Sequence, residues 1–81
     1  MITCHIFTPE GTSEDLETDI VIFDAPDARH GIVSGQMPTV LSVEEGQLTV
    51  SVQGKRVSYQ MGEGVVYFKD DVATFLVSSF G

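Results

Sequence analysis

Basic residues are scarce in this sequence of 81 residues. Lys and Arg together number 4, against 12 Asp and Glu, which gives a formal net charge of −8. A protein that binds nucleic acid by neutralising phosphates needs a basic surface, and so does one attracted to an anionic membrane. The composition therefore excludes direct binding to nucleic acid or to an anionic lipid surface, and its acidity favours basic partners.

Cysteine is nearly absent and long apolar runs are missing. Cys4 is the single cysteine, so no disulfide can form within the chain, and a reducing compartment is favoured. With no second cysteine or histidine pair beside it, Cys4 is predicted to be a small apolar strand residue. No stretch reaches the roughly 20 residues that span a membrane, and no signal-peptide pattern opens the chain. The sequence predicts a soluble protein, or one peripheral to something larger, without direct membrane insertion.

Polar groups that could converge on a catalytic or metal site are also lacking. His5 and His30 have no partner at the spacing of metal ligands, and His5 is predicted to point away from Cys4. The acidic pairs at 44–45 and 70–71 adjoin turns, where carboxylates are common without any catalytic role. No glycine-rich phosphate loop or nucleophile elbow is present. The residues alone predict a binding or structural module with no catalytic residue, no metal and no cofactor.

What the sequence does contain is alternation typical of β-strands. Apolar and polar residues alternate over residues 2–8, 47–53 and 56–61, further strands are predicted over 18–24, 65–68 and 72–77, and no segment has helical periodicity. Residues 12–17 are predicted to be a short edge strand or a loop. Residues 28–41 contain two glycines and a proline, which predict two sharp turns around a short buried strand. The expected fold is a single all-β domain over residues 1–81, a small sandwich or flattened barrel of about eight to ten short, mainly antiparallel strands.

Three predicted strands are apolar on both faces, at residues 20–23, 65–68 and 75–77. A sandwich buries only one face of each sheet, so its strands should alternate throughout. Either a partner covers an outer sheet face, or these strands add core near their ends. The pattern alone leaves both interpretations open.

The order of these elements resembles the N-terminal β-sandwich of the epsilon subunit of F-type ATP synthases, called delta in mitochondria. The resemblance is colinear over essentially the whole chain. Its segments are residues 6–11 (IFTPEG), 20–26 (IVIFDAP), 31–39 (GIVSGQMPT), 44–50 (EEGQLTV), 62–67 (GEGVVY) and 72–77 (VATFLV).

The sequence departs from the family pattern at two positions of its most characteristic segment. Gln36 stands where the family usually has histidine, and Ser34 stands where it usually has proline. The family's C-terminal helical hairpin has no counterpart in these 81 residues, so inhibition or nucleotide sensing by that hairpin is not assigned here.

The resemblance implies a non-catalytic central-stalk subunit of a proton- or sodium-translocating ATP synthase. Such a subunit docks on the gamma subunit and the c-ring in a hetero-oligomeric complex, on the cytoplasmic, matrix or stromal face of an energy-transducing membrane. Thr8 is expected to lie near Gln36. Carried over by position, the c-ring-facing loop consists of Asp27, Ala28, Arg29, His30 and Gly31, and the gamma-facing residues are Thr8, Gln36, Met37 and Pro38.

A second interpretation is a small β-barrel that binds a small molecule or carbohydrate. Arg29, His30 and Tyr59 would then supply the polar contacts to the ligand. The two interpretations differ in what covers the protein surface: a protein partner on a sheet face in the first, and a ligand among converging polar side chains in the second.

Overall fold

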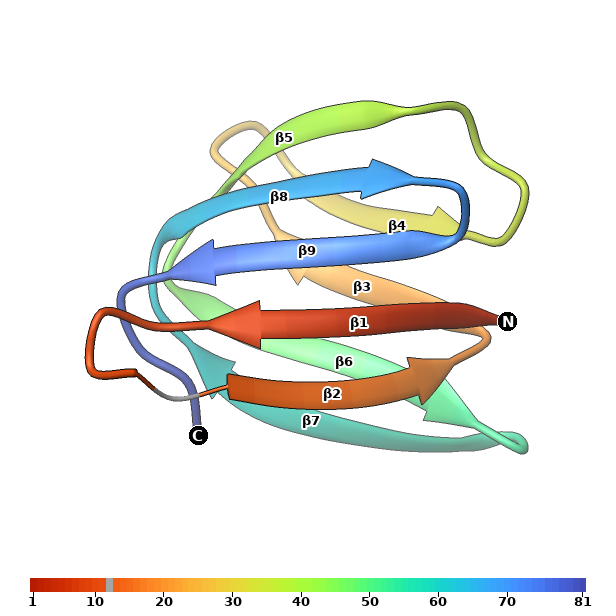
Figure 1. Cartoon of the computed structure of the whole chain (residues 1–81), viewed down its shortest axis with the longest axis horizontal. Helices are drawn as coiled ribbons and strands as arrows, with labels where there is room; N and C mark the ends of the chain where they lie inside the picture. The colour runs from red at the N-terminus through yellow and green to blue at the C-terminus, as the bar shows by residue number, and fades with distance from the viewer. Residues whose placement is uncertain (12) are drawn as a thin grey trace.

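The computed structural model describes residues 1–11 and 13–81, and Thr12, which belongs to the predicted edge strand or loop at 12–17, lies outside them. Two β-sheets stack face to face with the core between them (Figure 1). Within the described residues the strands are β1 (Ile2–Phe7), β2 (Ser13–Thr18), β3 (Ile20–Asp24), β4 (Arg29–Val33), β5 (Thr39–Val43), β6 (Gly46–Val52), β7 (Lys55–Met61), β8 (Gly64–Lys69) and β9 (Val72–Val77).

The five-stranded sheet has the order β2-β1-β9-β8-β5, and the four-stranded sheet has the order β4-β3-β6-β7. All neighbouring strands are antiparallel except β1 and β9, which are parallel. Figure 1 shows β1 between β2 and β9, so the first strand is central in its sheet although it begins the chain. The prediction of an all-β sandwich of mainly antiparallel strands is confirmed.

The core consists of the inward-facing side chains of both sheets. Phe23 from the four-stranded sheet meets Phe75 from the five-stranded sheet edge to face, with ring centroids 5.8 Å apart and an interplanar angle of 84°. Phe68 is fully buried in the same cluster. Burial raises the pKa of the Cys4 thiol to about 12, which keeps it protonated and identifies it as the apolar strand residue that the sequence predicted.

The chain crosses between the two sheets at Thr18, where the sequence predicted one continuous strand over residues 18–24. The Thr18 hydroxyl oxygen accepts the N–H groups of Ser51 (2.8 Å) and Ile20 (3.2 Å). Its O–H lies within hydrogen-bonding distance of the carbonyl oxygens of the same two residues. Strand β2 therefore ends at Thr18 and β3 begins at Ile20, because a buried hydroxyl satisfies the backbone at the crossing.

Candidate docking surface

Five exposed apolar side chains lie together on the outer face of the five-stranded sheet. Phe7, Leu76 and Val65 are direct neighbours in register across β1, β9 and β8. Tyr67 and Val40 form the adjacent pair across β8 and β5. Each side chain is between 41% and 66% exposed. We call these five residues the outer apolar patch, and monomeric domains rarely leave such a contiguous patch in water unless it has a function.

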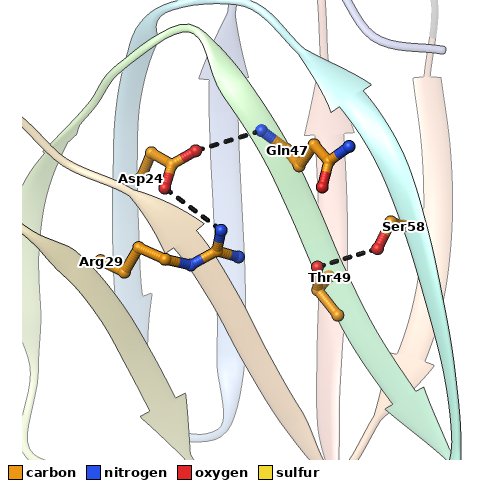
Figure 2. Close-up of polar contacts among 5 residues, drawn as sticks. All are labelled: Asp24, Arg29, Gln47, Thr49 and Ser58. Carbon is orange, nitrogen blue, oxygen red and sulfur yellow. Dashed lines mark hydrogen bonds and ion pairs between the residues drawn. The ribbon is translucent and has the colours of Figure 1, made fainter.

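The outer face of the four-stranded sheet differs sharply in chemistry over β6 and β7. The Thr49 and Ser58 hydroxyls form a cross-strand hydrogen bond of 3.0 Å (Figure 2). Ser51 opposes Arg56 one pair further along the same face. Arg56 and Ser58 are exposed, whereas Thr49 is buried beneath its hydrogen bond, so this part of the face presents polar groups to water. At the β3–β4 edge of this sheet, Val33 is 48% exposed beside half-buried Ile20. The five-stranded sheet therefore carries the larger group of exposed apolar side chains on its outer face.

For β8 and β9, the exposure of the outward side chains argues against the interpretation of the doubly apolar strands as additional core. Val66 and Phe75 point into the core, whereas Val65, Tyr67 and Leu76 point outward and are exposed. The outward side chains are thus not additional core. In β3, by contrast, the outward residues at 20 and 22 are already half-buried within the domain itself.

An apolar groove of about 360 Å³ borders the outer apolar patch where β1 and β9 end. Phe7 and Leu76 of the patch form one wall, and Thr8 and Pro9 follow directly after β1. Glu63 also lines the groove. Thr8, one of the residues assigned to gamma, therefore lies at one end of the patch.

Gln36, Met37 and Pro38 lie in the 34–38 loop between β4 and β5. The Gln36 N–H donates to the carbonyl of Val33, and the Val33 N–H donates to the Gln36 side-chain oxygen, both at 3.4 Å. Met37 is 79% exposed, the highest fraction of any large apolar residue described. The loop thus presents Met37 to the surroundings while Gln36 is partly used in shaping the loop.

Thr8 and the Gln36 loop lie at opposite ends of the five-stranded sheet. Gly35 contacts the β8–β9 turn at Asp71, and the Asp71 carbonyl accepts the N–H of Thr3 near the start of β1. Thr8 follows the other end of β1, and Figure 1 shows the two ends well separated. The expectation that Thr8 lies near Gln36 is wrong, because β1 runs the length of the sheet between them.

Asp71 holds the 34–38 loop through its carboxylate. One carboxylate oxygen accepts the N–H of Gly35 at 2.8 Å, and the other accepts the Ser34 hydroxyl at 2.5 Å. Both bonds lower the pKa of Asp71 below its ordinary value because they stabilise the charged form, and the bond from Gly35 has the larger effect.

This contact predicts a specific acid response. Because the pKa of Asp71 is lower in the folded chain, its stabilising contribution is present above the unfolded pKa and is lost as pH falls through the folded value. In a carboxyl NMR titration, Asp71 should protonate below pH ~3.9, the usual value for Asp. Ser34→Ala should raise the Asp71 midpoint, and an unchanged midpoint in that variant would contradict the contact.

The turn between β3 and β4 carries the residues assigned to the c-ring. The N–H of Ala25 donates to the carbonyl of Ala28 at 2.9 Å, which closes the turn tightly around Pro26 and Asp27. Asp27, Ala28 and neighbouring Pro26 are exposed at its tip. Arg29 and Gly31 at the start of β4 are exposed as well, so most of the assigned segment is accessible.

The charged side chains of this turn are paired within the domain. Arg29 lies 3.5 Å from the Asp24 carboxylate, whose other oxygen accepts the N–H of Gln47 at 3.3 Å (Figure 2). His30 bonds to Asp27 at 3.2 Å, and this bond is the main cause that lowers the pKa of Asp27. Arg29 and His30 begin strand β4, and His30 is half-buried there. A partner docking here meets side chains that are already paired within the domain.

Arg29, His30 and Tyr59 do not converge, as a small-molecule site would require. The first two lie in β4 and Tyr59 lies in β7, at opposite edges of the four-stranded sheet. Tyr59 packs against Phe80, with ring centroids 5.1 Å apart. Among residues 1–11 and 13–81, no group of three or more His, Cys, Asp or Glu side chains could hold a metal ion.

The sequence model of the ATP synthase delta/epsilon chain β-sandwich domain matches residues 1–80. The chain belongs to this family. It is 28% identical over 75 residues to the ATP synthase epsilon chain of Ruminiclostridium cellulolyticum, covering 93% of this chain and 56% of that protein. The β-sandwich thus spans little more than half the length of that relative.

Solved structures reproduce the fold at lower sequence identity. A chain of the Euglena gracilis mitochondrial ATP synthase, in an assembly with the c-ring, superposes with a TM-score of 0.85 at 18% identity, covering 99% of this chain and 52% of that one. A chain from the central stalk and c-ring of the Tetrahymena thermophila mitochondrial ATP synthase gives a TM-score of 0.77 at 13% identity, covering 99% and 65%. Both likenesses support the β-sandwich fold of the chain.

Part of the surface of this delta/epsilon domain was visible in its sequence and part was not. The doubly apolar patterns at 65–68 and 75–77 located three members of the patch. Phe7 and Val40 were missed because each is a single apolar residue in an otherwise ordinary pattern. The Asp71 contact was missed because it joins residues far apart in the sequence: Asp71 lies 36 positions after Gly35 and 37 after Ser34.

No helix within the part of the chain that the structure describes is long and apolar enough to cross a membrane.

Proposed function

We propose that this domain is a non-catalytic central-stalk subunit of an F-type ATP synthase that docks on the gamma subunit and the c-ring. In this role it couples proton or sodium flow to ATP synthesis by transmitting rotation. The observation that carries the proposal is the outer apolar patch in a member of the delta/epsilon family. A subunit that transmits rotation needs a broad, rigid contact with its partner, and a hydrogen-bonded β-sheet provides such a surface.

The gamma subunit is the partner proposed for the outer face of the five-stranded sheet. Thr8 stands at one end of this face and the 34–38 loop at the other, so residues that lie far apart can contact one partner. The central row through Leu76 provides the apolar contact, and a core of buried apolar side chains within a polar rim is the usual anatomy of such interfaces.

The c-ring is the partner proposed for the tip of the β3–β4 turn. Asp27 and Ala28 are exposed there, and Figure 1 shows this turn at the end of the sandwich where β1 ends. Its polar, locally paired side chains suit contact with the polar loops of a membrane ring rather than with lipid. The domain would accordingly be peripheral, on the cytoplasmic, matrix or stromal side of the membrane.

Binding to the gamma subunit of the same organism tests the proposal. The purified chain should bind gamma in solution with a dissociation constant of about 1 μM or tighter, as measured by calorimetry and by co-elution from a sizing column. An unrelated acidic β-sandwich domain serves as the control for charge-driven association. Absence of co-elution at about 10 μM of each protein would refute the proposed docking.

A further inference from the structure

The backbone conformation of the β8–β9 turn directs the Asp71 carboxylate towards the 34–38 loop. Asp70 and Asp71 both have positive φ, at 52° and 60°. Two successive positive φ values are typical of the tight hairpin turn, and aspartate tolerates them better than most residues. The side chain of Asp71 is thereby directed across to Ser34 and Gly35, while the Asp71 carbonyl accepts the N–H of Thr3.

The 34–38 loop depends on this carboxylate for its attachment to the five-stranded sheet. Its internal hydrogen bonds are the long Val33–Gln36 pair and a bond from the Thr39 hydroxyl to the Met37 carbonyl. Among the residues that the structure describes, Asp71 supplies the hydrogen bonds that reach this loop from another hairpin. Both oxygens of the carboxylate are used, so the loop is fixed in direction as well as in place.

We propose that Asp71 is a positioning residue for docking: it holds the 34–38 loop in the conformation in which Gln36 and Met37 meet the gamma subunit. This inference rests on the proposed function. A loop that is already ordered loses less conformational freedom on binding, so the fixed contact raises affinity without touching the partner. Removing it should weaken binding about tenfold, the effect of freeing one or two side chains and a short backbone segment.

Asp71→Gly and Asp70→Gly form a matched pair for the test. Glycine accepts positive φ at either position, and each change removes one negative charge from the same turn. In the described residues Asp70 makes no side-chain hydrogen bond or ion pair, so only the first variant frees the loop. Asp71→Asn keeps an acceptor oxygen for Gly35 and should restore part of the affinity.

Two measurements distinguish positioning from a general loss of structure. Amide hydrogen exchange of Gly35, followed by NMR, should accelerate at least about tenfold in Asp71→Gly and stay unchanged in Asp70→Gly. Calorimetry with gamma should show the tenfold loss in the same variant alone. Gln36→Ala should weaken binding in the unsubstituted chain and much less in the Asp71→Gly background, because the two residues act through one loop.

The outcomes separate this inference from the proposed function. If the unsubstituted chain binds gamma and the two glycine variants bind equally well, the positioning role is overturned and docking stands. Additive effects of Asp71→Gly and Gln36→Ala would likewise overturn the role. If the unsubstituted chain does not bind gamma, the proposed function fails and the docking role of Asp71 fails with it. A tenfold loss of affinity for gamma that is confined to Asp71→Gly, and that is not additive with the effect of Gln36→Ala, supports the positioning role.

Discussion

Replacing Leu76 with aspartate is expected to weaken binding to the gamma subunit by about 30-fold or more while the domain stays folded. Leu76 is the middle of the row that joins Phe7 to Val65, and its side chain is 54% exposed in the free domain. Truncating a central residue of an interface costs about 2 kcal/mol or more, which corresponds to roughly that factor. A carboxylate buried against an apolar partner adds a desolvation cost.

Val52→Asp is the matched control for this change. Val52 is 38% exposed at the end of β6, in the other sheet and opposite Lys55, so the new carboxylate gains a favourable neighbour. Its affinity for gamma should stay within about threefold of the unsubstituted value, in line with a surface change outside the interface. Calorimetry measures both affinities, and thermal melting checks that both variants are folded. Equal weakening by the two substitutions would show that added charge, not the outer apolar patch, controls binding.

The sequence predicted the fold class well because strand alternation is a local property. In a strand with one buried face the apolar residues recur at every second position, whatever the strand pairs with. Strands β1, β6 and β7 could therefore be located without knowledge of their neighbours. The Thr18 crossing was less visible. Its hydroxyl bonds to Ser51, 33 residues away, and that contact separates β2 from β3 within an apparently continuous pattern.

The candidate surface was predictable only where its signal was local. Val65, Tyr67 and Leu76 were indicated because they make a strand apolar on both faces. Their union with Phe7 into one patch depends on the parallel pairing of β1 with β9, which joins the beginning of the chain to its end. The same pairing separates Thr8 from Gln36. Strand pairing between distant segments is set by the packing of the whole core, and no short pattern in one sequence encodes it.

The opposite roles of two phenylalanines give the second large prediction. Phe75→Ala is expected to lower the free energy of unfolding by about 3–5 kcal/mol, the usual cost of removing a buried aromatic ring. Phe75 is fully buried and meets Phe23 across the two sheets, so the substitution opens a cavity where the sheets hold together. Total stability for a domain of this length is about 4–12 kcal/mol, so the loss is a substantial fraction of it.

Phe7→Ala provides the control with the same chemical change on the neighbouring strand β1. Because Phe7 is 41% exposed on the outer face, its truncation should cost about 1 kcal/mol of stability and act mainly on gamma binding. Urea titration followed by circular dichroism measures the two free energies of unfolding. Similar losses for both variants would contradict the assignment of Phe75 to the core and Phe7 to the outer apolar patch. A large stability loss at Phe75 with a large affinity loss at Phe7 would show that one sheet supports the core on one face and the partner on the other.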